Sequence, residues 1–505
     1  MEPTVLLIAV FMVCFCLYNI MKMTRFEKVN VPHERPYFFL GNMAPFFFQR
    51  MSMMENMERL YKRFPNTKYY GFYNFMTPTF IIRDPELITS VAIKNFNNFC
   101  DHNSFVNKEL DPMASRNIFS LRGDRWREMR KIISPAFSST KMKMMFQLMC
   151  ECADNFSNHM VNNKVNTTVN VKEEMSKYTN DVVATCAFGI NVDSFKYPNN
   201  EFYVMGRNCV NFETSLSFKF FLNIHFPNFA KFFRVQVFSK EVENFFKEIV
   251  SKTVSVREEK GITRPDVIQL LMETKDNNNR RMFDIDEMTA QAFVFFVAGF
   301  DTVATVMSFL AHEVAVNPDI QSKLRTEIDQ VLKENGGKPT YEAINSLKYM
   351  DAVINECLRL YPLGGFIDRI CVNEFVLPPP TPGGKPVTVK PGESIWFPSY
   401  PLHRDPKYFP EPNKFDPDRF LNGHMDNSVY MPFGIGPRTC IGNRFALIEM
   451  KVMLFHILWR CDLEPDAKTK IPIVLNKKTF LTMIDGGFWL KIRARNRQSP
   501  LRDEY

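Results

Sequence analysis

The sequence predicts a mainly α-helical protein with a smaller β part. Between residues 85 and 360 the apolar residues recur mostly at helical spacing, whereas alternating segments occur before and after that stretch. Residues 286–316 contain no proline and no glycine except Gly299, and Asn317-Pro318 ends the run. This pattern predicts a helix of about 30 residues, well above the mean length of about 11–12. Such a helix would cross the whole domain.

The predicted β part is drawn from both ends of the chain. Residues 68–73 and 78–83 alternate around residues 74–77 and predict a hairpin. Further strands are predicted at 366–372, 387–390 and 394–399, and a second hairpin at 479–492 with its turn at Asp485-Gly486-Gly487. No Gly/Ser linker, charge block or repeat divides the 505 residues. We therefore expect one large domain, residues 30–505, behind an N-terminal segment, residues 1–29.

The N-terminal segment has the composition of a membrane anchor. Residues 4–21 read TVLLIAVFMVCFCLYNIM and carry no charge, and as a helix they would reach about 27 Å, enough to cross a bilayer core. A basic region before them and a small-residue cleavage site are both missing, which favours an uncleaved signal anchor over a cleaved signal peptide. Lys22, Arg25 and Lys28 follow directly. Positive charge on that side predicts an endoplasmic reticulum anchor with the large domain in the cytosol.

A second membrane contact is predicted at residues 217–238, which read SFKFFLNIHFPNFAKFFRVQVF. The segment is dense in phenylalanine, carries Lys219, Lys231 and Arg234, and is interrupted by Pro227. Short aromatic and basic helices lie well in the plane of a membrane interface. A buried helix pair is the alternative interpretation.

Composition narrows the possible partners. The net charge is +8, but the basic residues are scattered and form no nucleic-acid motif, so a membrane surface or an acidic protein fits better than nucleic acid. The 11 cysteines include no C-x-x-C pair, which argues against a disulfide framework and a structural zinc site. This cysteine usage predicts that the main domain lies in the reducing cytosol. The glycosylation sequons at Asn155 and Asn166 should then stay unmodified.

Residues 433–442 form a glycine-rich loop, FGIGPRTCIG, that leads into an apolar helix over about 443–459. Glycines allow the backbone to turn tightly around a bulky group. The N-terminus of the helix and a nearby arginine both favour the thiolate form of Cys440 over the thiol. The pattern therefore predicts a metal-ligating sulfur, although a single buried cysteine is more often a small inert core residue.

This loop resembles the cysteine-ligand loop of the cytochrome P-450 haem-thiolate monooxygenases. Further motifs follow in the family's order, so that the resemblance extends from the N-terminal anchor to the end of the predicted C-terminal hairpin. In style the chain is most similar to insect microsomal members associated with detoxification. The resemblance implies the cytochrome P-450 fold behind a transmembrane helix and haem b (iron protoporphyrin IX) as cofactor. It also implies Cys440 as the axial iron ligand and Phe433 as a cofactor-binding residue of the same loop.

The middle of the predicted long helix reads AGFDT over residues 298–302. Gly299 costs about 1 kcal/mol relative to alanine, and Asp301 and Thr302 are also poor interior choices. We expect a local opening of the helical hydrogen-bond ladder here. The resemblance implies that Thr302 hydrogen-bonds the oxygen species at the iron and that Asp301 relays protons. In the alternative, Thr302 bonds a carbonyl four residues earlier and Asp301 lies on a solvated face.

Four residues match partners of the haem propionates in the family. Trp126 and Arg130 are four positions apart and so share a helix face. Arg369, in the strand after Tyr361-Pro362, and Arg438, in the cysteine loop, match further propionate partners. Each arginine alone would more often be a surface residue; together they supply the positive charge that two propionates need.

Glu356 and Arg359 lie at i and i+3 on one predicted helix face. An exposed pair of this kind contributes little. By resemblance, these two residues join Arg419 of the later P-D-R-F motif in a buried network behind the haem. A bidentate network of arginine and carboxylate is rigid, so its role would be structural.

The resemblance also implies partners. Basic residues expected on the proximal face, for docking an acidic NADPH-cytochrome reductase, are Arg127, Lys131, Lys143 and Arg444. Segments expected to line the distal pocket are 105–119, 295–302, 363–367 and 483–484; they are mostly apolar, which suits a lipophilic substrate.

The function expected is that of a monomeric, membrane-bound monooxygenase. It would insert one oxygen atom from dioxygen into lipophilic small molecules, with xenobiotics as the expected class, using NADPH electrons. One rival is a haem-thiolate isomerase or dehydratase that needs no dioxygen, although such relatives tend to lose the acid–threonine pair. Other rivals are a hydroxylase of endogenous hormones or lipids and a non-catalytic haem carrier or gas sensor.

Overall fold

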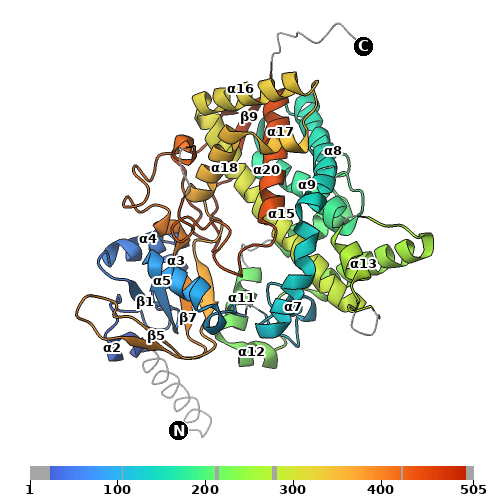
Figure 1. Ribbon diagram of the computed structural model, residues 1–505. Helices are drawn as coiled ribbons and strands as arrows, with labels where there is room; N and C mark the ends of the chain where they lie inside the picture. Colours follow the sequence, from blue (N-terminus) through green and yellow to red (C-terminus); the bar gives the residue numbers. More distant parts are fainter. Residues whose placement is uncertain are drawn as a thin grey trace, which may run out of the picture.

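The computed structural model describes residues 23–104, 106–210, 215–264, 266–275, 281–421 and 425–495. In these residues the chain is mainly helical with a smaller β part (Figure 1), as predicted. The α-helices are α2 (Arg25–Lys28), α3 (Ala44–Phe47), α4 (Met53–Arg63), α5 (Pro85–Thr89), α6 (Pro112–Ser115), α7 (Gly123–Ile133), α8 (Ser139–Asn163), α9 (Val171–Val183), α10 (Glu201–Cys209), α11 (Ser215–His225), α12 (Pro227–Phe232), α13 (Lys240–Lys260), α14 (Val267–Glu273), α15 (Ile285–Val316), α16 (Pro318–Glu334), α17 (Tyr341–Asn345), α18 (Lys348–Leu360), α19 (Ser399–Leu402) and α20 (Asn443–Arg460). Short 3-10 or π segments are η1 (Ser90–Lys94), η2 (Phe96–Asn98), η3 (Ser134–Phe137), η4 (Ala184–Phe188) and η5 (Pro417–Phe420).

The strands form three small sheets. They are β1 (Tyr69–Asn74), β2 (Thr77–Ile82), β3 (Thr168–Asn170), β4 (Ile367–Ile370), β5 (Phe375–Leu377), β6 (Val387–Val389), β7 (Ser394–Phe397), β8 (Cys461–Pro465) and β9 (Trp489–Ala494). The largest sheet has the order β1-β2-β7-β4, and β2 pairs with β7 in parallel. Early and late parts of the chain therefore share one sheet, as the blue and orange strands of Figure 1 show.

The first predicted hairpin is confirmed, and the second was wrong. β1 and β2 pair antiparallel around a turn at Phe75 and Met76. Residues 479–492 contain the expected turn, since Gly486 and Gly487 both have positive φ, but β9 pairs with β8 and β3 rather than with the residues before that turn. Instead, residues 482–485 fold back on residues 474–476. The partner strand β8 begins directly after α20, about 30 residues before β9. Short-range alternation carries no information about pairing over such a distance.

The long central helix is confirmed as α15. It begins after Asp284, whose side chain accepts a hydrogen bond from the backbone N–H of Glu287 at 2.7 Å. The helix crosses the middle of the molecule (Figure 1) and packs against α9, α18 and α20. A Cβ on Gly299 would lie 2.7 Å from Cγ2 of Val183 on α9. Glycine is therefore required there because it allows the two helices to approach each other closely.

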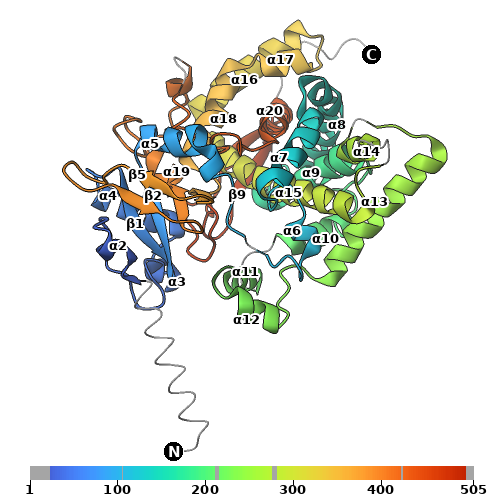
Figure 2. The ribbon, with the colours of Figure 1, turned by 60° about the horizontal axis from the view of Figure 1, so that its bottom comes forward.

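Pro227 interrupts residues 217–238 as predicted, which form α11 and α12 at one end of the molecule (Figure 2). Phe218, Phe229, Phe232 and Phe233 on this pair are all at least half exposed. The exposure of these four side chains is inconsistent with the alternative of a fully buried helix pair. Exposed aromatic rings of this number are typical of an interaction surface.

The predicted transmembrane segment, residues 4–21, lies outside the described residues. Among the residues that are described, α15 alone is long and apolar enough to cross a membrane, and 61% of its apolar window is buried inside the protein. That burial is what a core helix requires.

Candidate active site

The cysteine loop is fixed by its own backbone. The N–H of Cys440 donates to the carbonyl of Phe433 at 2.8 Å, which closes the loop. Gly434 and Gly436 have φ of 86° and 76°, a left-handed conformation that favours glycine. A Cβ on Gly436 would lie only 2.2 Å from the carbonyl oxygen of Ala92. The glycines therefore let the loop turn and also pack against η1.

The side chain of Cys440 is exposed although protein surrounds it closely. Desolvation by that protein raises the pKa of its thiol. A hydrogen bond from the backbone N–H of Gly442 and the positive charge of Arg130 act in the opposite direction and lower that pKa. Exposure combined with desolvation is what a side chain on the wall of an internal cavity shows. The expected helix N-terminus and cation are present, but burial outweighs them.

One face of α15 is open in the same region. Ala298 is exposed and Thr302 is half exposed, whereas most other residues of the helix are buried. These two residues are four apart and so share a face. Phe137 links this stretch to the cysteine loop. Its ring lies 5.5 Å from that of Phe295 and 3.8 Å from where a Cβ of Gly442 would be.

The side chains of Thr302 and Asp301 point to different partners. The hydroxyl of Thr302 donates to the carbonyl of Ala298, which is the back-bond of the alternative interpretation. Oδ1 of Asp301 accepts a hydrogen bond from Nζ of Lys172, on α9, at 2.7 Å, and both side chains are mostly buried. The other half of the alternative, an Asp301 on a solvated face, is therefore wrong.

The expected opening of the helical ladder was also wrong, since α15 is α-helical throughout residues 298–302. Its carbonyls instead accept additional hydrogen bonds from side chains. The hydroxyl of Thr179 on α9 donates to the carbonyl of Phe300 at 2.8 Å. The ammonium of Lys172 donates to the carbonyl of Asp301 at 3.0 Å. Close packing of α9, made possible by Gly299, thus replaces the local opening that the sequence suggested.

Two buried arginines each keep one unsatisfied N–H. Arg369 donates to the carbonyls of Asp368 and Ile435, but its Nε has no partner within the described chain. Arg438 donates to the carbonyl of Cys100 at 2.7 Å and to Asp101 at 3.2 Å, but its Nη1 has none there. Burial lowers the pKa of each to about 10, so both stay charged at neutral pH. Buried polar groups are normally paired, so both nitrogens call for a further acceptor.

Trp126 and Arg130 share the inner side of α7. The guanidinium of Arg438 lies 4.0 Å from the ring centre of Trp126, a cation–π contact. The guanidinium of Arg130 makes no hydrogen bond or ion pair with any part of the chain that the structure describes, and its charge acts on Cys440. The structure therefore brings Trp126, Arg130, Arg438 and Cys440 into one neighbourhood.

Glu356, Arg359 and Arg419 form one buried network. Arg359 binds Glu356 through two hydrogen bonds of 2.7 and 2.8 Å, and both side chains are 0% exposed. Nε of Arg419 donates to the same carboxylate at 3.1 Å. Arg359 also donates to the carbonyls of His403 and Pro412, at 2.8 Å each, and so holds the segment before the cysteine loop.

The four basic residues expected to dock a reductase lie on α7, α8 and α20, and all four are exposed. Arg127 pairs with Asp124 at 2.7 Å, and Lys143 pairs with Glu342 at 2.5 Å. Lys131 and Arg444 form no ion pair among the described residues. The face therefore carries fewer free charges than the sequence suggested.

The segments expected to line the distal pocket are partly brought together; residue 105 lies outside the described residues. The N–H of Thr482 donates to the carbonyl of Leu363 at 3.0 Å, which joins the last two segments. Gln291 on α15 accepts a hydrogen bond from the N–H of Ile118 at 2.9 Å, which joins the first segment to the central helix. Sequence reasoning missed Gln291 because a single glutamine carries no motif.

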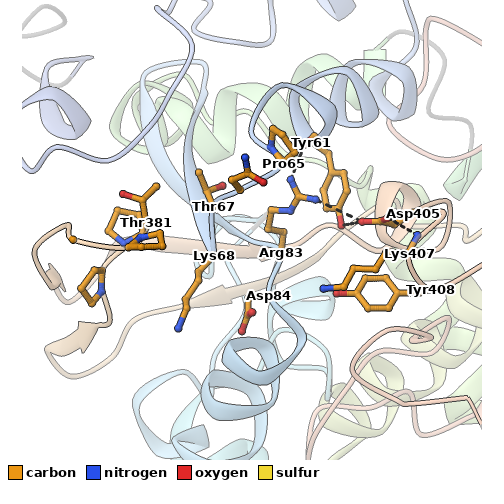
Figure 3. A pocket seen from close by; sticks show the side chains of 15 residues that line it. Tyr61, Pro65, Thr67, Lys68, Arg83, Asp84, Thr381, Asp405, Lys407 and Tyr408 are labelled. Atoms are coloured by element: carbon orange, nitrogen blue, oxygen red, sulfur yellow. Dashed lines mark hydrogen bonds and ion pairs between the residues drawn. The ribbon is translucent and has the colours of Figure 1, made fainter.

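Two cavities open on the protein. The first, of about 480 Å³, is lined mostly by polar and proline residues from α4 to β2, residues 379–383 and residues 405–408 (Figure 3). At its base Tyr61 donates to Asp405 at 2.7 Å, and Arg83 lies beside both. No residue of α15 or of the cysteine loop lines it, so it is separate from the space that Cys440 faces. The second, of about 350 Å³, is lined by Lys172 and Asp301 among others.

Lys172 is the site residue that sequence reasoning missed. It lies 129 positions before Asp301, and nothing around it in the sequence marks it out. In the described residues, no group of three or more histidine, cysteine, aspartate or glutamate side chains is placed to hold a metal ion. Among the described residues, Cys440 therefore does not share a metal site with two or more other side chains of these types.

Comparison with known proteins identifies the family of this chain. The profile of the family "Cytochrome P450" matches residues 31–490. Cytochrome P450 9e2 of Blattella germanica is 43% identical over 94% of each chain. Probable cytochrome P450 9f2 of Drosophila melanogaster is 37% identical, over 93% of this chain and 95% of its own. Cytochrome P450 6j1 of Blattella germanica is 34% identical, over 97% and 98%. Given this coverage and identity, the chain belongs to the cytochrome P450 family of haem-thiolate monooxygenases, which bind haem b through a cysteine thiolate.

Proposed function

We propose that Cys440 is the axial ligand of the haem iron. The observation that carries this proposal is that its side chain is exposed although the protein around it desolvates the thiol, with the Gly442 N–H and Arg130 beside the sulfur. Burial raises the pKa of the thiol, so a positive charge beside the sulfur is needed to favour its ionised form. A bound metal ion supplies that charge and deprotonates a coordinating thiol. The Gly442 N–H then donates to the resulting thiolate.

The two unsatisfied arginine nitrogens fit the carboxylates of the same cofactor. We propose that Arg369 and Arg438 hold the haem propionates, with Trp126 and Arg130 beside them. A charge-assisted hydrogen bond to a carboxylate would satisfy each buried nitrogen. Asp101 and the surrounding carbonyls keep Arg438 in place, because they already occupy its other donors.

When bound, haem with a thiolate ligand supplies the activation of dioxygen that monooxygenation requires. The chain's own part is to deliver protons, exclude water and orient the substrate. We propose that Thr302 presents its hydroxyl on the open face of α15. To donate outward, that hydroxyl must leave the carbonyl of Ala298, a rotation about one bond. Asp301, the next residue, relays protons toward Thr302 Oγ1.

We propose a structural role for Glu356, Arg359 and Arg419. Their network connects α18 with the segment from His403 to Arg419, which leads into the cysteine loop. The loop keeps its shape only while that segment is fixed. The phenyl ring of Phe433, whose carbonyl closes the loop, would lie against the cofactor.

The residues expected to line the distal pocket indicate the substrate class. Residues 106–119, 295–302, 363–367 and 483–484 are largely apolar, so we propose lipophilic small molecules, with xenobiotics as the class to test first. Oxidation of endogenous hormones or lipids uses the same site and is the second candidate. A haem-thiolate isomerase is less favoured because Asp301 and Thr302 are both present.

We propose that residues 1–29 anchor residues 30–505 to the cytosolic face of the endoplasmic reticulum membrane. The exposed phenylalanines of α11 and α12, with Lys231 and Arg234 among them, support a second contact with that membrane. Electrons from NADPH would arrive through a flavoprotein reductase that docks on the face carrying Arg127, Lys131, Lys143 and Arg444, with the chain acting as a monomer.

The test is a carbon monoxide difference spectrum of the reduced protein, followed by turnover with NADPH, reductase and a set of lipophilic compounds. We expect a strongly red-shifted Soret band and oxygenated products that form only with NADPH and dioxygen. Turnover without NADPH would instead support the isomerase. A Soret band without the shift would refute thiolate ligation by Cys440.

A further inference from the structure

The side chain of Lys172 reaches from α9 to Asp301 on α15. Its Nζ donates to Oδ1 of Asp301 at 2.7 Å, to the carbonyl of Asp301 at 3.0 Å and to the hydroxyl of Thr305 at 2.7 Å. An ammonium group has three donors, so these contacts use all of them. The side chains of Lys172 and Asp301 are 18% and 14% exposed. At this burial an ion pair is weakly screened by salt and holds its geometry.

The backbone of α9 is itself held against α15 nearby. Thr179 donates to the carbonyl of Phe300, and the missing side chain of Gly299 leaves room for Val183. The backbone of α9 at Lys172 is therefore held in a fixed position relative to residues 299–305. A long, flexible side chain anchored in this way reaches Asp301 in one arrangement.

The pair also forms part of the wall of the second cavity. That cavity is bounded by α9, α10, α15 and residues 476–483. The charged and titratable groups that line it are Lys172, Glu173, Tyr203, Arg207, Asp301 and Lys478. Burial lowers the pKa of Lys172, and the neighbouring Asp301 opposes that shift. Among these groups, Lys172 alone forms an ion pair with Asp301 within the described chain.

Resting on the proposed role of Asp301, we propose that Lys172 is the positioning residue of the proton-delivering pair. Its ammonium fixes the Asp301 carboxylate at the wall of the cavity, where water can reach it. A proton then passes from water in the cavity to the Asp301 carboxylate, and from Asp301 to Oγ1 of Thr302, which at the same time gives up its own hydroxyl proton on the open face of α15. Lys172 itself keeps its proton throughout and touches neither substrate nor cofactor.

The physical reason is electrostatic and geometric. An opposite charge at hydrogen-bond distance favours the ionised form of a carboxylate and restricts its orientation. Without the ammonium, Asp301 would face the cavity as a mostly buried carboxyl with no counter-charge. Loss of an opposite charge disfavours the ionised form of a buried carboxyl group, and the orientation of the Asp301 side chain would no longer be fixed.

The experiment compares variants of the full chain loaded with haem. Lys172→Met removes the charge and keeps the apolar stem, Lys172→Arg restores a cation, and Arg207→Met removes a cation from the same cavity without touching Asp301. The measured quantity is the fraction of NADPH electrons that appear in oxygenated product rather than in hydrogen peroxide, as a function of pH.

For Lys172→Met we expect that fraction to fall about tenfold, a part of the roughly 10²–10⁴-fold that positioned proton transfer contributes. The acid limb of its pH profile should move to higher pH. Lys172→Arg should recover most of both properties, and Arg207→Met should leave the profile in place. An equal shift in Arg207→Met would mean that the net charge of the cavity matters and would overturn the positioning role.

A second readout does not depend on turnover. Thermal unfolding of Lys172→Met, Asp301→Asn and the double variant should be non-additive, because the two side chains interact. Additive losses would show that the pair does not form in solution and would refute the proposal. If Lys172→Met does not fold, Lys172→Gln replaces it in both measurements.

Different results would refute the role of Asp301 and the role of Lys172. If Asp301→Asn couples electrons to product as well as the natural chain does, the proposed role of Asp301 is wrong. If Asp301→Asn loses coupling but Lys172→Met keeps both the coupling and the pH profile of the natural chain, the role of Asp301 stands and that of Lys172 is refuted.

Discussion

Replacing Arg359 by methionine should unfold the region behind the cysteine loop. The substitution keeps much of the side-chain volume but removes the guanidinium from a network that is 0% exposed. Glu356 would lose both of its hydrogen bonds from Arg359 and keep those from Arg419 and from the N–H of Asp416. The carbonyls of His403 and Pro412 would lose a charged donor as well.

The size of the effect follows from these contacts. Removing one partner of a buried ion pair costs about 3–5 kcal/mol, because the other charge is left without compensation. Arg419 still faces Glu356 and reduces that cost, whereas each orphaned carbonyl adds about 1–3 kcal/mol. We expect a loss of about 4 kcal/mol in the free energy of unfolding, against a total of roughly 5–15 kcal/mol for a typical protein.

The assay is the ratio of haem absorbance to protein in the purified variant, with the urea midpoint of unfolding measured in parallel. We expect Arg359→Met to contain little or no haem and to unfold at a much lower urea concentration. The matched control is Lys62→Ala. It breaks a pair with Glu58 in which the lysine side chain is 68% exposed, and such i,i+4 pairs contribute about 0.3–0.5 kcal/mol.

Normal haem content together with an unchanged urea midpoint in Arg359→Met would refute the structural role of the network. A change no larger than that of Lys62→Ala would have the same meaning, since it would show that the buried pair contributes no more than a surface pair.

Four further predictions concern other parts of the molecule. Cys440→Ser should abolish the red-shifted carbon monoxide band, and its persistence would identify another ligand. Gly299→Ala should destabilise the protein because its Cβ would meet Val183 at 2.7 Å; a thermal melt should show recovery when Val183→Ala is added. Burial raises the pKa of Asp181 to about 7, above its unfolded value near 3.8, so its contribution to stability is complete below about pH 4 and is lost as pH rises through about 7. Asp181→Asn should flatten that part of the curve of unfolding temperature against pH, and an unchanged curve would contradict the shift. Finally, a chain without residues 1–21 should still sediment with membranes in moderate salt, through α11 and α12; complete solubility would exclude that contact.

Local sequence patterns predicted the elements of the site well. The run without proline and with one glycine predicted α15 almost to the residue, and the glycine-rich loop around Cys440 predicted the helix that follows it. Spacing of three and four residues placed Glu356 beside Arg359 and Trp126 near Arg130. These inferences succeed because residues a few positions apart in a helix are neighbours in space.

Patterns failed where pairing is long-range. The second hairpin was assigned to the wrong partner because β9 pairs with β8, which begins directly after α20, and with β3, more than 300 residues earlier. The ladder of α15 was expected to open because Gly299, Asp301 and Thr302 are poor helix formers. In the structure it stays closed, since packing against α9 outweighs weak propensity.

By itself, the sequence determined the class of fold, the central helix and the cysteine loop, because each depends on contacts between residues close in the chain. Only the tertiary structure decided which groups face the internal space and which arginine nitrogens lack a partner. It also decided that Lys172, 129 residues away, meets Asp301. The physical reason is that burial and charge pairing arise when distant segments pack together, and no short stretch of sequence records which segments those will be.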